Sequence, residues 1–265
     1  MKNFCIYCDC DDVMLADSHV IPKSIRKRLT GLKTSSGNTQ YKFRWFDRPD
    51  LPNQDLPKPN LLCERHDNLF GSKIESFAAQ ALMPAKHDFS QSHHLPPNWK
   101  IISLPLDEGE IRVGSYNAPD AKFDDAVRKF AVLTAWRALH ALRLDGEKPV
   151  VDFLRSVEGE QLNASTIRFL NLDTDHIDLL FENFAEIYFT GPDFAIDLTG
   201  SDEDMPFAYA YLERNNQIAI GVMMGFWVIV WPLLKDSDPM RDYEEICNMV
   251  FLDWHEYMLK KFTNS

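Results

Sequence analysis

The chain has 265 residues, 45% of them hydrophobic, and a net charge of −12 at pH 7. This length allows one large domain or two ordinary ones, with enough apolar material for a core. The five cysteines argue against a disulfide framework, because their number is odd and low for this length. The longest apolar run, Ile218 to Trp231, is too short to cross a bilayer as a helix. The first residues show no secretory signal, so we expect a cytoplasmic protein that does not enter membranes.

Two pairs of candidate metal ligands, each with a two-residue gap, lie in the first quarter of the chain. Cys5 and Cys8 form the first pair, and Cys63 and His66 form the second. Three thiolates and one imidazole make a tetrahedral ligand set that Zn²⁺ prefers. Cys10 could replace one of these ligands, and buried thiols without a metal are the alternative interpretation. The spacing therefore predicts a structural zinc site.

The elements expected around these ligands are short. Residues 1–22 are predicted to form a knuckle and a β-hairpin, and Lys23–Leu32 a basic helix. Tyr41–Phe46 alternates as a strand does, and four prolines between residues 48 and 60 indicate an extended loop. The apolar spacing from Leu61 to Ala81 predicts a helix that begins near the second ligand pair.

Positive charge is concentrated between residues 23 and 48. This stretch has eight basic residues and one acidic residue, a net charge of +7, so the rest of the chain carries −19. Aromatic residues alternate with the basic ones near its end, a pattern typical of phosphate contact combined with base stacking. The alternative is a solvated helix face followed by an ordinary strand. The candidate nucleic-acid contacts are Lys23, Arg26, Lys27, Arg28, Lys42 and Arg44.

The remainder of the chain differs in composition. Residues 84–98, rich in Pro, His and Ser, are predicted to be a linker, and residues 99–265 an acidic region of mixed helices and strands. In chain order we expect a strand pair in Ile101–Tyr116, a buried helix Phe123–Leu144, short helices in 150–157, 164–169 and 176–184, a hairpin of Phe207–Glu213 with Gln217–Trp231, and a helix Met240–Lys261. The acidic region is expected to bind a protein partner or to form oligomers, and no motif in it names a ligand.

Three N-terminal motifs together resemble a known family. They are Cys5-x-x-Cys8, Ser18-His19-Val20-Ile21-Pro22-Lys23 and Leu61-Leu62-Cys63-x-x-His66. In this order they resemble the zinc-bound HNH endonucleases of the ββα-metal (His-Me finger) fold, specifically a bacterial group with the signature SHIIPK…LLC. The resemblance covers about residues 1–80. It implies an α+β protein in which a ββα-metal finger with zinc knuckles (1–83) precedes the linker (84–98) and a larger α+β domain (99–265).

The resemblance also implies catalytic roles. His19 matches the general base that takes a proton from water, and an imidazole suits that task near neutral pH. Asp67 follows the fourth zinc ligand, where the family has His or Asn, and a carboxylate is a good ligand for Mg²⁺ or Mn²⁺. Asn68 is the alternative at this position. Ser18 replaces the acid or His that usually precedes the base, so Asp17 is expected to supply the second ligand.

Asn60 has two interpretations. It approximates the middle Asn of the family, which orients the histidine or holds the loop, although it lies closer to Cys63 than is typical. It also precedes an apolar periodic run, as a helix N-cap does.

The sequence thus yields two hypotheses. The first is a metal-dependent endonuclease that hydrolyses phosphodiester bonds of DNA, or of RNA, through contacts in residues 23–48. The second is a non-catalytic, zinc-stabilised module that binds nucleic acid or protein.

Overall fold

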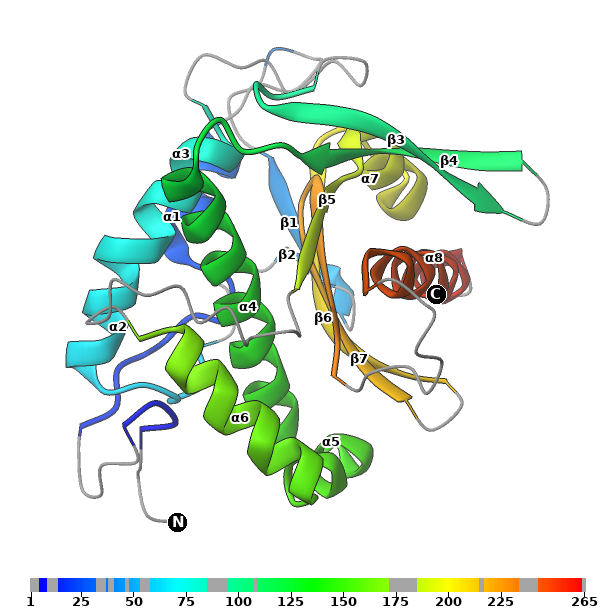
Figure 1. Ribbon diagram of the computed structural model, residues 1–265. Helices are drawn as coiled ribbons and strands as arrows, with labels where there is room; N and C mark the ends of the chain where they lie inside the picture. Colours follow the sequence, from blue (N-terminus) through cyan, green and yellow to red (C-terminus); the bar gives the residue numbers. More distant parts are fainter. Residues whose placement is uncertain are drawn as a thin grey trace.

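The computed structural model describes residues 5–8, 14–31, 37, 41–45, 48–52, 58–84, 95–106, 109–171, 185–214, 217–233 and 243–263. Its centre is an eight-stranded sheet with the order β2-β1-β6-β7-β8-β5-β4-β3 (Figure 1). The strands are β1 (Lys42–Trp45), β2 (Arg48–Pro52), β3 (Trp99–Leu106), β4 (Gly109–Tyr116), β5 (Glu186–Phe189), β6 (Asp204–Arg214), β7 (Gln217–Met224) and β8 (Trp227–Pro232). Neighbouring strands are antiparallel except β1 and β6, which are parallel. The predicted α+β class is confirmed.

Helices cover both faces of the sheet. They are α1 (Lys23–Thr30), α2 (Glu64–Phe70), α3 (Ser76–Leu82), α4 (Ala121–Leu144), α5 (Lys148–Leu154), α6 (Val157–Phe169), α7 (Gly191–Thr199) and α8 (Tyr243–Thr263). A π-helical turn, Gly71–Glu75, joins α2 to α3. Figure 1 shows α4 on one face of the sheet, with α1 to α3 and α6 outside it, and α7 and α8 on the other face. None of the helices in the described part of the chain has the length and apolar character needed to cross a membrane.

The two faces have separate apolar cores because strand side chains alternate. Ile220 and Val222 of β7 belong to the core on the α4 side, whereas Met223 belongs to the core beneath α8. Both faces of β7 and β8 are therefore buried, which explains the continuous apolar run in this part of the sequence. Trp254 of α8 lies against Gly221, where an added Cβ would meet its ring at 1.9 Å.

The α4 helix confirms the prediction of a buried helix. Asp120 caps its start by accepting from the backbone N–H of Lys122 and Phe123, both at 3.0 Å. Every residue from Phe130 to Leu142 is buried. Alanines at many of these positions let the helix lie close to the sheet on one side and to α3 on the other.

Other predictions are confirmed or corrected by the strands. β3 and β4 pair antiparallel from Trp99–Tyr116 to Leu106–Gly109, as expected, and β6 pairs with β7. The predicted strand Gln217–Trp231 is in fact two strands, because Gly225 adopts φ 63° and reverses the chain between β7 and β8. The predicted helix 176–184 lies outside the described residues.

The N-terminal region is tied to the rest of the molecule. Leu15 pairs with Cys63 in an antiparallel bridge, and Ala16 N–H donates to Leu62 O at 2.8 Å. The strand predicted within Tyr41–Phe46 is present as β1, but it pairs with β6 and extends the large sheet. The boundary predicted between residues 1–83 and 99–265 is therefore not a boundary of the sheet, and most of the predicted linker lies outside the described residues. The hairpin of a ββα-metal finger stays a prediction.

Candidate metal centre

Four side chains, Cys5, Cys8, Cys63 and His66, converge as the sequence predicted. Their candidate ligand atoms all lie within 4.8 Å of one another. His66 Nδ1 is 3.1 Å from Cys63 Sγ and 3.7 Å from Cys5 Sγ. Ligand atoms around a tetrahedral zinc ion lie about 3.6–3.8 Å apart, given Zn–S near 2.3 Å and Zn–N near 2.1 Å. This cluster could hold a metal ion such as zinc.

The chain brings these ligands together from two segments. Cys63 is the N-cap residue of α2, and His66 lies three residues later on the same side of the helix. A turn at residues 6–8 presents Cys5 and Cys8, and Ile6 N–H donates to Leu61 O at 2.9 Å. Cys5 and Cys63 are buried, whereas Cys8 and His66 are half-buried. The result is a closed donor set beside the start of a helix.

The surroundings favour the protonation states that metal binding needs. Burial alone would raise the pKa of the Cys5 thiol, but hydrogen bonds from the backbone of Cys63, Cys8 and Tyr7 together hold that pKa below its ordinary value. Burial, with a smaller contribution from the charge of Arg65, lowers the pKa of His66. A thiolate and a neutral imidazole are the forms that bind metal, so both effects act in the same direction.

The segment Asp17–His19 is anchored directly to the ligand-bearing helix. The bridge between Leu15 and Cys63 holds the chain just before this segment, and the buried side chains of Val20 and Ile21 hold it just after. Within it Asp17 is exposed, Ser18 is fully buried and His19 is half-buried. Burial removes Ser18 from consideration as a ligand in an open site, which leaves Asp17 as the carboxylate of this segment.

Asp67 has a partner that the sequence did not reveal. Arg137 of α4, 1% exposed, places Nη2 at 3.2 Å from Asp67 Oδ1 and Nη1 at 2.5 Å from Glu75 Oε1. One guanidinium thus joins α2 and the π-helical turn to α4. The signal in the sequence was Arg137, the single arginine between Phe130 and Leu142 in a helix predicted to be buried nearly all round, because such an arginine requires an anionic partner.

Asn68 and Asn60 lie elsewhere. Asn68 is exposed and lines a depression of about 380 Å³ with Arg65, His66 and Ser72, among others. Asn60 is exposed, and the N-cap of α2 is Cys63, so the prediction of Asn60 as N-cap is wrong. Asp67 contacts Arg137 of α4, whereas Asn68 lines this depression, so the two residues have different surroundings.

The basic residues of the 23–48 stretch have different environments. Arg28 donates to the carbonyls of Ala79 and Met83 at 3.1 and 2.7 Å and so ties α1 to the last turn of α3. Lys42 forms an ion pair with Glu203 at 3.2 Å. Lys23 and Lys27 are exposed on α1. The side chains of Arg26 and Arg44 lie outside the described part of the structure.

No protein-family model, curated protein or solved structure matches this chain. The resemblance to zinc-bound HNH endonucleases therefore rests on the three sequence motifs.

Proposed function

We propose that this protein is a metal-dependent endonuclease of the HNH type, which hydrolyses phosphodiester bonds of DNA. One observation carries the proposal: the Cys₃His cluster lies where the Asp17–His19 segment joins the helix that bears Asp67 and Asn68. The candidate base and the candidate ligands of a divalent ion are thus on two segments that meet at residues 61–63.

In this proposal the Cys₃His cluster holds a structural zinc ion. All four donors come from protein side chains, which is the pattern of structural rather than catalytic zinc sites. The cluster joins residues 5–8 to the start of α2, and the neighbouring bridge between Leu15 and Cys63 carries this order to His19. Loss of zinc is therefore expected to disorder the candidate base as well as the knuckle.

His19 is the general base. Its backbone lies between buried Ser18 and buried Val20, which fixes the point from which the imidazole extends. It accepts a proton from water, and the resulting hydroxide attacks the phosphorus atom. A Mg²⁺ or Mn²⁺ ion, held by Asp17 with Asp67 or Asn68, would stabilise charge on the phosphate and on the leaving oxygen.

Phosphate contacts are assigned to α1. Lys23 and Lys27 are exposed on this helix, which begins four residues after His19. Arg28 acts differently, since its hydrogen bonds to Ala79 and Met83 fix α1 against α3. We expect the Lys23 and Lys27 contacts to add affinity without sequence selectivity and to weaken with salt.

Plasmid cleavage in the presence of Mg²⁺ or Mn²⁺ tests the proposal. Wild type is expected to nick or linearise the plasmid. His19→Ala is expected to lose about 100-fold or more of the rate, with unchanged zinc content and DNA affinity. His255→Ala, a half-buried histidine on α8, is the matched control and should cleave as wild type does. Equal cleavage rates for wild type and His19→Ala would refute the assignment.

A second candidate function is a zinc-stabilised module that binds nucleic acid or protein without cutting it. The contact between Arg137 and Asp67 favours it, because the guanidinium already supplies a cation to the carboxylate that a divalent ion would need. This function predicts salt-dependent DNA binding and zinc in the protein, with no cleavage under any divalent metal.

A further inference from the structure

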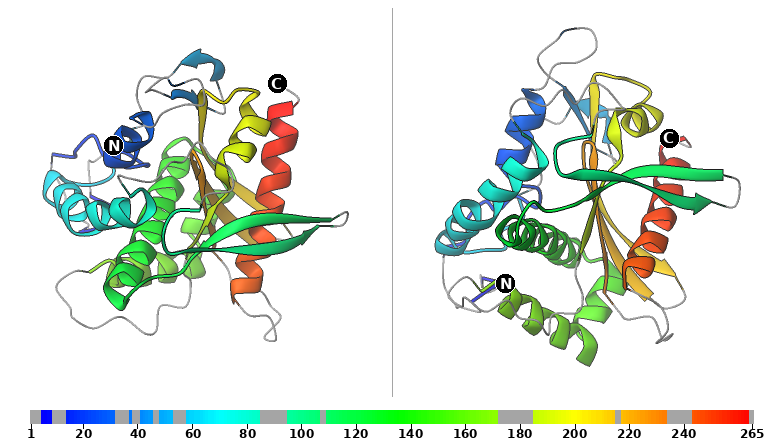
Figure 2. Two further views of the ribbon diagram at one scale, coloured as in Figure 1. Left: turned by 90° about the horizontal axis from the view of Figure 1, so that it is seen from above. Right: turned by 45° about the horizontal axis from the view of Figure 1, so that its top comes forward.

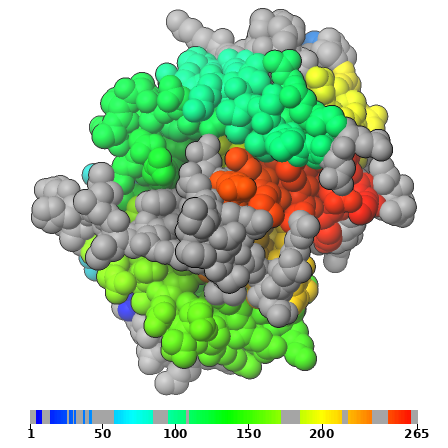
Figure 3. Space-filling model, turned by 45° about the vertical axis from the view of Figure 1, so that its right-hand side comes forward, coloured from blue at the N-terminus to red at the C-terminus, as the bar shows by residue number. Residues whose placement is uncertain are grey.

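A second cavity lies on the opposite side of the sheet from the metal centre. It has a volume of about 420 Å³, within the range of small-molecule sites. Figure 3 shows the β3–β4 hairpin, α7 and α8 meeting on this side of the molecule, and Figure 2 shows the hairpin extending beyond the sheet edge. β4 pairs with β5 only at Gly114 and Ser115, so the rest of the hairpin is free to form a wall of the cavity.

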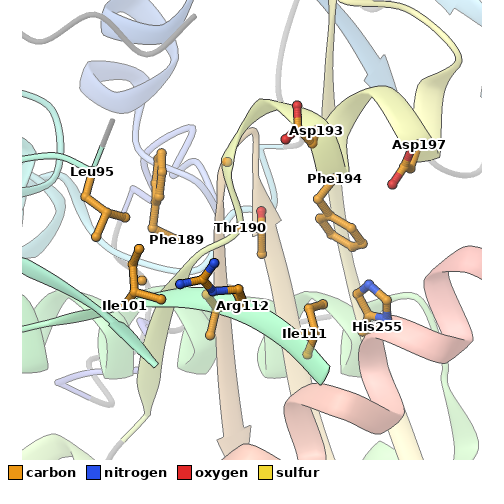
Figure 4. Close-up of a pocket in the computed structure, with 13 residues that line it drawn as sticks. Leu95, Ile101, Ile111, Arg112, Phe189, Thr190, Asp193, Phe194, Asp197 and His255 are labelled. Atoms are coloured by element: carbon orange, nitrogen blue, oxygen red, sulfur yellow. The ribbon is translucent and has the colours of Figure 1, made fainter. Parts of the chain in front are cut away.

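Apolar and aromatic side chains form part of the lining. Ile101 and Ile111 come from the hairpin, and Phe194 comes from α7 (Figure 4). Ile101 is 51% exposed, which is high for a large aliphatic side chain. The Phe194 ring stacks on the imidazole of His255 at 4.7 Å with an interplanar angle of 21°. Phe194 is only 6% exposed, so the half-buried imidazole of His255 is the part of this pair that a ligand can reach.

Charged groups of both signs line the same cavity. Arg112 projects from β4, while Asp193 and Asp197 lie four residues apart on one side of α7 (Figure 4). Within the described part of the chain these three side chains form no ion pair or hydrogen bond, although the charge of Asp197 acts on His255. A guanidinium and two carboxylates thus line one space without pairing with one another.

The charge balance of the lining restricts the ligand. Burial lowers the pKa of His255, with the charge of Asp197 as a smaller opposing effect, so the imidazole is neutral near pH 7. Two carboxylates and one guanidinium therefore give the cavity a net charge of −1. Residues 150–265 contain 21 acidic and 7 basic residues, so the surrounding field also attracts cations.

We propose that this cavity binds a free basic amino acid. The ligand carboxylate pairs with Arg112, and its two cationic groups pair with Asp193 and Asp197. Its aliphatic stem lies along Ile111, and a planar cation lies against the imidazole of His255, which stacks on Phe194. L-arginine has each of these groups, a net charge of +1 and a planar guanidinium.

Calorimetric titration of the full chain with L-arginine and agmatine tests this assignment. Agmatine lacks only the carboxylate, so it should bind about tenfold more weakly than L-arginine, the effect of one charge-assisted contact. In Arg112→Gln the preference for L-arginine should be lost, because its carboxylate loses its cationic partner whereas agmatine has no carboxylate to pair. Asp197→Asn should weaken both ligands about equally.

Arg155→Gln and Asp152→Asn serve as matched controls, since both residues are exposed and lie outside the cavity. Both controls should bind as wild type does, and the exposed positions of Arg112 and Asp197 should leave the melting temperature of every variant unchanged. Absence of L-arginine binding, equal affinity of wild type for the two ligands, or an undiminished difference between them in Arg112→Gln would each overturn the proposal.

Discussion

The knuckle at residues 5–8 and the helix α4 differ in how they are connected to the rest of the molecule. The knuckle contributes two candidate metal ligands and a backbone hydrogen bond from Ile6 to Leu61, just before α2. By contrast, α4 is surrounded by protein along most of its length, and Phe130 and Trp136 are fully buried. We therefore expect the knuckle to depend on a bound metal, whereas the centre of the fold depends on apolar burial.

The largest effect is expected from removing a metal ligand. Structural zinc contributes about 10–16 kcal/mol of binding free energy in zinc-finger peptides. Cys63→Ser should therefore lose the metal and expose residues 5–8, 14–19 and 61–70 to fast amide hydrogen exchange, while α4 and the sheet stay protected. Cys247→Ser is the control, since Cys247 is buried in the core beneath α8 and should leave the metal content unchanged. Full metal content in Cys63→Ser would contradict the assignment of Cys63 as a metal ligand.

Truncation of a core side chain in α4 is expected to lower the stability of the fold without loss of the metal. Phe130→Ala should lower the free energy of unfolding by about 3–5 kcal/mol, because it removes a fully buried ring and leaves a cavity. Metal content should not change. Leu144→Ala, at a position 51% exposed on the same helix, should change stability by less than about 0.5 kcal/mol. Denaturant titration with metal analysis checks both variants. Equal losses of unfolding free energy in the two variants would show that apolar burial does not determine the stability of α4.

Arg137→Met removes the contact between the two regions. It leaves Asp67 and Glu75 without their cation, and we expect a loss of about 1–3 kcal/mol. Since Asp67 is then available to a divalent ion, Mg²⁺ should raise the melting temperature of this variant more than that of wild type. Arg128→Met, which breaks an exposed ion pair with Asp124 on the same helix, should cost less than about 0.5 kcal/mol. If Mg²⁺ raises the melting temperature of wild type and of Arg137→Met by the same amount, then the guanidinium of Arg137 does not keep a metal ion from Asp67.

A further prediction concerns acid. His140 of α4 is buried, and burial, with the charge of Arg143, lowers its pKa to about 3 although Asn163 accepts a hydrogen bond from it. The unfolded chain binds this proton near pH 6.5, so protonation favours unfolding. Stability should be complete above about pH 6.5 and fall as the pH drops toward 3, by up to about 1.4 kcal/mol per unit.

His140→Gln should flatten this dependence, because Gln does not titrate and can still reach Asn163. The comparison is made by denaturant titration between pH 7 and 4. An unchanged slope in the variant would assign the acid sensitivity to other groups.

Features that depend on residues close together in the sequence were predicted correctly, whereas contacts between distant residues were not. Cys5, Cys8, Cys63 and His66 were found because ligand spacing within each pair is local, and α4 and the β3–β4 hairpin because their periodicity is local. The parallel pairing of β1 with β6 was missed, since residues 42–45 and 204–207 share no local pattern. The Asp67–Arg137 contact was missed for the same reason, and it bears most directly on the proposed metal ligand Asp67.

The metal content of purified protein tests the central claim most directly. Both proposed functions of the N-terminal region rest on a structural zinc ion at the Cys₃His cluster. We predict one zinc ion per chain and an X-ray absorption spectrum that fits three sulfur ligands and one nitrogen ligand. Folded protein without zinc, or zinc with a ligand set of oxygen and nitrogen alone, would contradict the account.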